Sequence, residues 1–340
     1  MAKKVKLADI GEKLGVSAVT VSKALSDQEG VSAEMRAKIK ALAEDMGYQP
    51  PRSEKEKKEK SYNIGILISE VFFNQIQSFY WRVYQELAVR AAAKGCFTML
   101  EIVSKEDEKK LSLPRLFEGN KVDGFIIIGL MSSEYLDHLE DNLSVPYVFL
   151  DFYRNEKEDA DAVVTDNFLG MYRLVNHLID MGHKKIAYVG TLMATNSITD
   201  RYFGYCKSLI EHGIELRNDY IVDDRVYVNN DLLNPEDFSF PKDMPTAFAC
   251  NCDTSAALLI KALSLKGLNV PDDISVVGFD NYIAPGNPDV NLTTCEVDVR
   301  EMAVQSIRIL IAKINGDNYK KGILTVPGKI VLRDTVKKIQ

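Results

Sequence analysis

The sequence predicts an α/β protein in which parallel β-sheets are covered by helices, preceded by a small all-helical unit. From Asn63 onward, short apolar runs of strand length alternate with amphipathic helical segments, which is the pattern of βα units in parallel sheets. The first 50 residues show helical periodicity alone and end at Pro50-Pro51, where a helix cannot continue. With 340 residues, 46% of them apolar, the chain can bury more than one core.

Charge separates the same two parts. Residues 1–60 carry 13 Lys and Arg against 10 Asp and Glu, whereas the remaining 280 residues carry 29 against 39. We call residues 1–50 the head and the rest of the globular chain the body. A basic N-terminal part, the head together with the ten residues that follow it, on an acidic body indicates that only the head meets a polyanion such as nucleic acid.

Composition also bears on the compartment. No apolar run approaches the length of about 20 residues that spans a bilayer, and the charged N-terminus lacks the apolar core of a secretory signal. The five cysteines are scattered and odd in number, so they form no disulfide framework. We therefore expect a cytoplasmic protein without a metal or other cofactor.

The head contains the most specific local pattern of the chain. Gly15 provides the positive φ of a tight turn, and Ser17 can cap the helix that follows it. Gly11 is small where two helices would cross closely. A third helix, residues 33–46, is predicted with Ser32 as its N-cap. This spacing is typical of a helix-turn-helix.

The second helix of this motif, residues 17–25, predicts the DNA-reading surface. Small and apolar side chains allow close approach to the major groove and contact with thymine methyl groups, and Lys23 can donate to guanine. Hydroxyl groups near the start of the helix suit phosphate contacts. The predicted DNA-binding residues are Ser17, Ala18, Val19, Thr20, Ser22 and Lys23. The alternative is a helical domain that docks on protein.

The sequence of the body predicts two similar lobes with a boundary near residues 159–162, because the body is too long for a single parallel sheet covered by helices. Strands are expected at 64–68, 97–103, 124–129, 147–151, 162–165, 185–190, 247–251 and 275–280, and helices at 76–94, 169–181, 200–212 and 255–266. Ligands of such sheets bind at the carboxyl ends of the strands.

Polar and aromatic side chains follow several of these strand ends. Carboxylates can accept paired hydrogen bonds from neighbouring hydroxyls, Arg201 can donate a planar fork, and aromatic rings can stack on a sugar. The predicted effector-binding residues are Phe72, Phe73, Asn74, Asp151, Ser197, Arg201, Asn251, Cys252 and Asp280. The aromatic residues could instead pack in the core, and Asp280 and Arg201 could form a structural ion pair or cap.

The residues from VKLADIGEKLGVSAVTVSKAL onward resemble the LacI/GalR family of bacterial transcription regulators. The motifs VVTDNFLGMYRLVNHLIDMGHKKIAYVG, FACNCDTSAALLIKAL and VPDDISVVGFDN follow in the family's order. The resemblance implies a homodimer on a pseudo-palindromic DNA operator and a two-lobed, periplasmic-binding-protein-like body that binds an effector. It also implies effector contacts at Asp151, Ser197, Arg201, Cys252 and Asp280. At Cys252 some relatives have Asn, a role that Asn251 could take here.

The resemblance sets the expected domain boundaries. The head covers residues 1–50, a charged linker or degenerate hinge covers 51–61, and the effector-binding and dimerisation domain covers 62–340. Lobe 1 is expected at about 62–161 and 293–322, and lobe 2 at about 162–292 and 323–340. The hinge departs from the family, because Glu54 and Lys57 stand about where an Ala and a minor-groove Leu are usual. We therefore expect weaker operator bending than in relatives with that wedge.

These observations predict an effector-controlled regulator, expected to be a repressor that responds to a sugar. Control by a protein partner or a non-sugar metabolite is the first alternative. A solute-binding protein is the second, but it predicts an export signal and no head. Enzymatic activity is not expected, because the chain lacks nucleotide-binding glycine motifs and a G-x-S-x-G nucleophile elbow.

Overall fold

The computed structural model describes residues 5–46, 48, 61–73, 78–154, 160–226, 231–283 and 290–340. The chain divides into two compact units, Met1–Glu59 and Lys60–Gln340. The predicted linker lies outside the described residues except for Ser61, as does Asn74. Within the described ranges, no helix is both long and apolar enough to cross a membrane.

The first unit is the predicted three-helix head: α1 (Leu7–Leu14), α2 (Ala18–Leu25) and α3 (Ala33–Asp45). Gly15 ends α1 at φ 66°, and Ser17 caps α2 by accepting a hydrogen bond from the Thr20 amide. A Cβ on Gly11 would lie 2.5 Å from the Val16 carbonyl oxygen, so the close approach at this turn requires glycine. The buried core of the head consists of Ile10, Val21, Ala24, Ile39 and Ala43.

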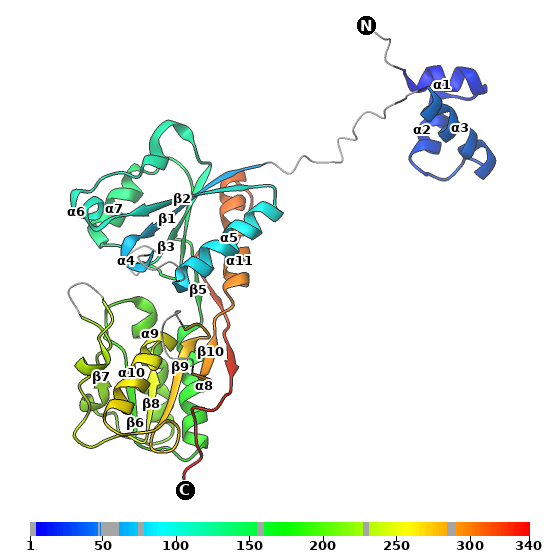
Figure 1. Ribbon diagram of the computed structural model, residues 1–340. Coiled ribbons are helices and arrows are strands. Elements are labelled where there is room, and N and C mark those ends of the chain that lie inside the picture. Colours follow the sequence, from blue (N-terminus) through cyan, green and yellow to red (C-terminus); the bar gives the residue numbers. More distant parts are fainter. Residues whose placement is uncertain are drawn as a thin grey trace. The chain divides into compact units, whose positions relative to one another are not determined.

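The second unit, the body, contains two six-stranded sheets (Figure 1). Lobe 1 has the order β11-β5-β4-β3-β1-β2 and lobe 2 the order β12-β10-β9-β8-β6-β7. Among the twelve strands that the structure describes, every pairing is parallel except that of β12 with β10. The α/β class, the helix-turn-helix head and the two doubly wound sheets are therefore confirmed.

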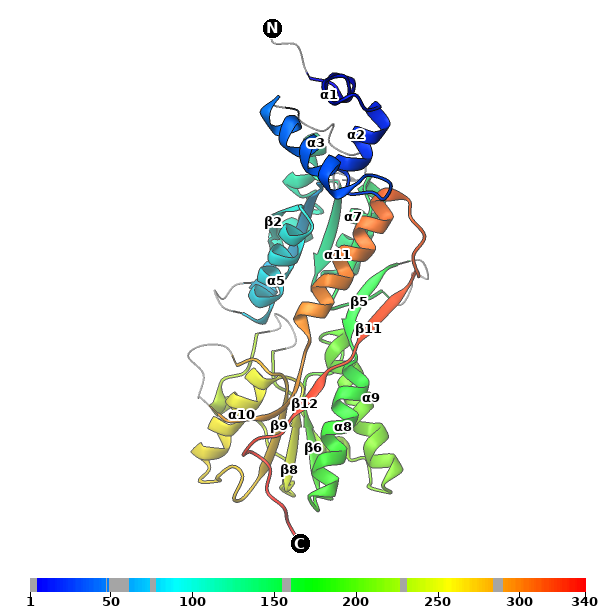
Figure 2. The same cartoon turned by 90° about the vertical axis from the view of Figure 1, so that its right-hand side faces the viewer.

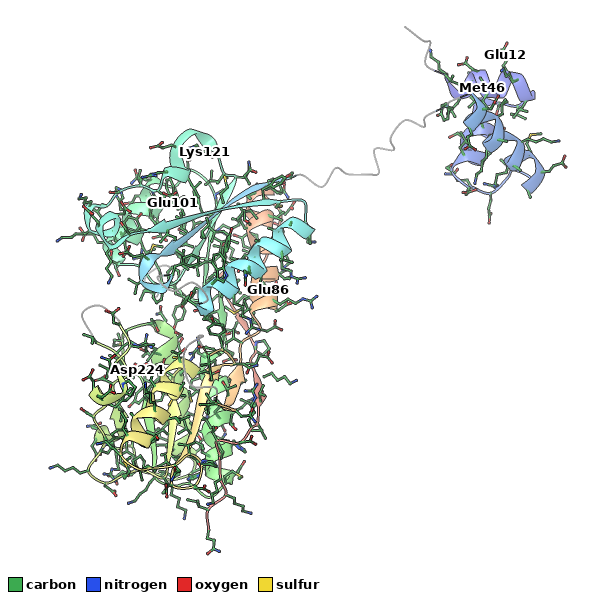
Figure 3. All side chains as sticks on the ribbon, in the orientation of Figure 1. Glu12, Met46, Glu86, Glu101, Lys121 and Asp224 are labelled. Carbon is green, nitrogen blue, oxygen red and sulfur yellow. The ribbon has the colours of Figure 1, made fainter. Side chains whose placement is uncertain are left out.

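The elements of lobe 1 come from two stretches of chain. The first holds β1 (Asn63–Ser69), α4 (Glu70–Phe73), α5 (Phe79–Ala93), β2 (Phe97–Val103), α6 (Lys105–Lys110), a 3-10 turn (Arg115–Asn120), β3 (Gly124–Ile128), α7 (Ser133–Asn142), β4 (Tyr147–Leu150) and β5 (Ala162–Thr165). The second holds α11 (Val299–Asn315) and β11 (Ile323–Val326). Helices α5 and α11 lie side by side on one face of the sheet, and Glu86 is on α5 (Figures 1 and 3).

Lobe 2 lies between these stretches and takes its last strand from beyond them. Its elements are α8 (Asn167–Asp180), β6 (Ile186–Val189), α9 (Asn196–Glu211), a 3-10 turn (Asn218–Tyr220), β7 (Ile221–Val222), a second 3-10 turn (Pro235–Asp237), β8 (Ala247–Cys250), α10 (Asp253–Leu265), β9 (Ser275–Asp280), β10 (Thr293–Glu296) and β12 (Lys329–Val331). Helix α10 covers one face of its sheet, and α8 and α9 cover the other (Figure 2).

The chain passes between the lobes after β5, after β10 and after β11, and this differs from the predicted lobe boundaries. Strand β5, expected in lobe 2, pairs with β4 of lobe 1. Strand β10, expected in lobe 1, pairs with β9 of lobe 2, and β11, expected in lobe 2, pairs with β5. These strands have four residues each. A segment that short predicts a strand but does not indicate which sheet it joins.

Candidate functional site

The outer face of α2 carries most of the predicted DNA-binding side chains. Ala18, Val19, Ser22 and Lys23 are exposed, and Val19 is 65% exposed although it is apolar. Ser17 is also exposed, whereas Thr20 is half-buried and its hydroxyl lies 2.9 Å from the Ser17 hydroxyl. An exposed surface of this small size and low polarity can approach base edges closely.

A cavity of about 430 Å³ lies between the two lobes of the body, at the carboxyl ends of their strands. Seven predicted effector-binding residues line it: Phe72, Asp151, Ser197, Arg201, Asn251, Cys252 and Asp280. Phe73 is not among the described residues that line the cavity, because its ring packs against Trp81 at 5.4 Å. Asn74 lies outside the described residues.

Asp151 and Asp280 occupy equivalent places in the two lobes. Asp151 directly follows β4 and Asp280 ends β9, and each of these strands is third in its sheet from the edge formed by β11 or β12. Both residues have a positive φ, 68° and 105°. Such a backbone is unfavourable for a residue with a Cβ and is found most often at functional sites. The fold therefore presents one carboxylate from each lobe to the same cavity.

The surroundings of these two carboxylates disfavour their charged forms. Burial raises the pKa of Asp280 to about 6, and Asp151 adds to this shift while Arg201 opposes it. Burial also raises the pKa of Asp151, against the effect of the Tyr80 hydroxyl that donates to it at 2.8 Å. Both groups therefore gain from a ligand that donates hydrogen bonds.

Arg201 is held by protein groups on all three of its nitrogens. Its Nε donates to the Asn167 side chain at 2.8 Å, its Nη1 to the Asn251 carbonyl at 2.5 Å, and its Nη2 lies 3.1 Å from Asp280. The guanidinium also lies 3.8 Å from the centre of the Phe279 ring. The ion pair with Asp280, the alternative considered from the sequence, is thus present, and both of its members line the cavity.

A second buried network was missed by the sequence analysis. Asp224 is 0% exposed and accepts hydrogen bonds from Arg225, Asn251, Ser255 and the Thr191 amide. These bonds and the Arg225 charge hold the pKa of Asp224 well below its usual range. Arg225, bound through two nitrogens to Asp224, lines the cavity. Figure 3 labels Asp224 in lobe 2.

This network defines the place of Asn251. Its side chain is committed to protein partners, because Nδ2 donates to the Val189 carbonyl and to Asp224, and Oδ1 lies 3.4 Å from Arg225 Nη2. The residue is 1% exposed. Asn251 therefore holds both arginines of the cavity in position, one through its backbone and one through its side chain.

Two helices begin at the cavity wall. Helix α9 starts at Asn196 with Thr195 as its cap, so the prediction that it begins near Arg201 was wrong by one turn; the Thr195 hydroxyl binds the Ile198 amide and fixes the earlier start. The Ser197 hydroxyl lies 2.9 Å from that of Thr195. Cys252 caps α10 by accepting from the Ser255 amide, and burial raises the pKa of its thiol to about 11.

Further lining residues were not predicted as effector contacts. They are Val71, Ser78, Phe79, Tyr80, Thr195, Ile198, Arg225, Asp231, Leu232, Thr254 and Tyr282. Arg225 follows a two-residue strand, which is too short to give a periodic signal. Tyr80 lies in the first turn of α5 and not at a strand end, where the effector contacts were predicted. In the part of the chain that the structure describes, no group of three or more His, Cys, Asp or Glu side chains could hold a metal ion.

Comparisons with known proteins agree with both units. The model of bacterial regulatory proteins of the lacI family matches residues 6–51, and a periplasmic binding protein-like domain matches residues 175–336. The HTH-type transcriptional repressor PurR of Mannheimia succiniciproducens is 27% identical over 346 residues, covering 98% of this chain and 99% of its own.

Solved structures show the same fold. The lac repressor dimer bound to operator and the anti-inducer ONPF is 24% identical with a TM-score of 0.65, and the complex of the transcriptional regulator CelR with cellobiose is 20% identical with a TM-score of 0.66. Each covers 98% of this chain and 100% of its own. The chain therefore joins a head that matches the lacI family of bacterial regulatory proteins to a body that matches a periplasmic binding protein-like domain.

Proposed function

We propose that this lacI-family regulator represses transcription by binding a pseudo-palindromic operator as a homodimer, under control of a small effector that binds between its lobes. The exposed face of α2 supports the DNA-binding part of this proposal. The Gly15 turn and the Ser17 cap position this helix, and they lie in the part of the chain that matches the lacI family model. Helix α2 enters the major groove, and the hydroxyls of Ser17, Thr20 and Ser22 contact phosphates.

The effector part is supported by the cavity between the lobes. Its carboxylates come from both lobes, Arg201 and Arg225 come from lobe 2, and these groups converge on one space, as in sites that close around a polar ligand. We propose a sugar, contacted by Asp151, Ser197, Arg201 and Asp280, with the ring of Phe72 against its apolar face. Cys252 and Asn251 support the wall. A neighbouring structure that holds cellobiose is in keeping with a sugar.

Dimerisation is proposed along α5. Trp81 and Tyr84 lie half-buried on this helix with ring centres 5.5 Å apart, and an aromatic pair of this kind suits an interface anchor. Sedimentation of the full chain is expected to show a dimer.

Genomic footprinting with the purified full chain tests the DNA-binding part. We expect discrete two-fold symmetric sites, and loss of those sites in the variant Lys23→Ala combined with Val19→Asp. A matched control, Lys38→Ala on the exposed side of α3, is expected to retain them. Symmetric sites that persist in the α2 variant would show that another surface reads the DNA.

Calorimetry against sugars and nucleobases tests the effector part. A sugar that binds and changes operator affinity supports it. Binding of a nucleobase alone would favour the non-sugar alternative. Silence across the whole panel would favour a protein partner.

A further inference from the structure

The charges that face the cavity are unevenly neutralised. Within the described part of the chain, Asp151 has the Tyr80 hydroxyl as its hydrogen-bond partner and forms no ion pair with Lys or Arg. The two arginines of the wall are each paired with an acid, Arg201 with Asp280 and Arg225 with Asp224. An anionic ligand would therefore meet the Asp151 carboxylate together with arginines whose charge is already compensated.

Asp151 and Asp280, two of the carboxylates that line the cavity, belong to different lobes; their charges repel one another, and Arg201 attracts both. Both residues line the same cavity, although one follows a strand of lobe 1 and the other ends a strand of lobe 2, and the charge of Asp151 raises the pKa of Asp280. Closing the lobes on an empty cavity brings like charges together in a poorly solvated space. A ligand that places a positive charge between the two carboxylates replaces this repulsion by attraction to the ligand.

Aromatic rings surround the same space. Phe72 and Tyr80 lie 5.1 Å apart by ring centres, Phe79 lies 5.4 Å from Tyr80, and Tyr282 faces Phe79 from the other lobe at 6.1 Å. All four rings line the cavity. Carboxylates combined with aromatic faces are the surroundings that proteins use for ammonium groups, because both attract a cation.

Resting on the proposed effector site, we propose that the effector is an amino sugar whose protonated amine lies between Asp151 and Asp280. The ammonium has three N–H donors, enough to reach a carboxylate of each lobe and a ligand hydroxyl or water. The site discriminates by charge: a neutral sugar adds no positive charge to the one that Arg201 supplies to the two carboxylates, and a phosphorylated sugar adds a further negative group beside them.

Calorimetry on the full chain with three matched sets tests the inference. The probes are glucosamine, glucose and N-acetylglucosamine; galactosamine, galactose and N-acetylgalactosamine; and glucose 6-phosphate with glucose. We expect one free amino sugar to bind about tenfold or more tightly than its neutral and N-acetylated partners, since acetylation removes the charge but keeps the nitrogen. Glucose 6-phosphate is expected not to bind.

Two variants locate the effect. Asp151→Asn keeps the shape of the side chain and is expected to bring the ratio of amine to neutral affinity close to one. Asp141→Asn makes the same change on the exposed surface of α7 and is expected to keep the ratio of the parent chain. Thermal unfolding of Asp151→Asn shows that the variant is folded when its titration is measured.

The possible outcomes separate the inference from the function on which it rests. A neutral, N-acetylated or phosphorylated sugar that binds as tightly as the amine overturns the amine and leaves a sugar-controlled repressor. An amine preference that survives in Asp151→Asn overturns the placement of the charge. If no amino sugar binds, the inference is also overturned. If no sugar and no nucleobase binds, control by a small effector is contradicted as well.

Discussion

Tyr153 and Asp200 join the two lobes by a hydrogen bond. The Tyr153 hydroxyl, in the segment that follows β4 of lobe 1, donates to the Asp200 carboxylate on α9 of lobe 2, 3.0 and 3.1 Å from its two oxygens. Elsewhere between the lobes, the rings of Phe79 and Tyr282 meet edge to face at 6.1 Å. Opening of the cavity by rotation of the lobes must break or stretch these contacts.

We therefore predict that Tyr153→Phe shifts the body toward an open arrangement. The loss of one hydrogen bond to a charged acceptor corresponds to about 1–3 kcal/mol, or a change of about fivefold or more in the equilibrium between open and closed forms. Small-angle X-ray scattering of the variant should show a larger radius of gyration. The control is Tyr172→Phe, which removes a tyrosine–carboxylate bond to Glu211 inside lobe 2. Equal scattering from both variants would mean that Tyr153 does not hold the lobes.

Val19 predicts a dependence of DNA binding on thymine methyl groups. Its apolar side chain is 65% exposed on α2 and has no hydrogen-bonding group with which to read a base. Replacing the contacted thymine by uracil removes one methyl group, which corresponds to about 0.8 kcal/mol or roughly fourfold in affinity.

Gel shifts with operators substituted one thymine at a time measure this dependence. The fourfold loss should occur at one position per half-site, should vanish in Val19→Ala, and should be restored by 5-bromouracil, whose bromine fills the methyl position. A full set of substitutions without effect would contradict a role for Val19.

Gly11→Ala is expected to unfold the head and spare the body. The new methyl group would lie 2.5 Å from the Val16 carbonyl oxygen, a backbone atom that cannot move without displacing the turn. We expect a loss of about 2 kcal/mol or more in the free energy of unfolding of the head.

Calorimetry of the full chain should resolve this loss as a change in the transition of residues 1–59, because these form a compact unit of their own. Glu12→Ala changes the neighbouring exposed residue and should leave both transitions in place. A head that melts normally in Gly11→Ala would show that the α1–α2 turn can adjust.

Asp280 predicts a pH dependence of stability with a definite sign. Its pKa is near 3.8 in the unfolded chain and about 6 in the folded protein. Burial and the charge of Asp151 raise this pKa, and the charges of Arg201 and Arg225 partly oppose the rise. The folded protein therefore keeps this proton while the unfolded chain loses it. The stabilisation from Asp280 is complete below about pH 4 and is lost as the pH rises through about 6.

Asp280→Asn removes this titration. As the pH rises from about 4 to 7, the difference in the free energy of unfolding between the two proteins should shift in favour of the variant. The shift should be at most about 3 kcal/mol, at about 1.4 kcal/mol per pKa unit. Urea unfolding of both proteins at several pH values measures the difference, and the same variant should lose its response to effector. Asp141→Asn should show no such trend. A difference that stays constant with pH would contradict the raised pKa.

The head could be predicted almost completely from the sequence because its signals are local. The Gly15 turn, the Ser17 and Ser32 caps and the small Gly11 each act within a few residues of the chain, and the structure has all four. The interior strands of the body were found equally well, since strands such as Ser275–Asp280 are apolar and bounded by clear turns.

The remaining errors arise from strand pairing and from contacts that the residue pattern does not indicate. Strand β11 pairs with β5 across more than a hundred residues of chain, whereas β5 and β10 each pair with the strand that precedes them, β4 and β9, and a strand of four residues does not indicate that choice. The same holds for the cavity. Residue type predicted Asp151 and Asp280, whereas the network of Asp224 and Arg225 depends on β7, β8 and α10 meeting in three dimensions.

The three passages of the chain between the lobes bear on how the protein is made. Neither sheet can be completed until its last strand has left the ribosome, β11 at Ile323–Val326 for one and β12 at Lys329–Val331 for the other. The three helices near the N-terminus, by contrast, need only their own 59 residues. A nonsense codon between residues 60 and 322 would release an intact DNA-reading unit without two complete sheets, and such a product would lack the complete cavity between the lobes.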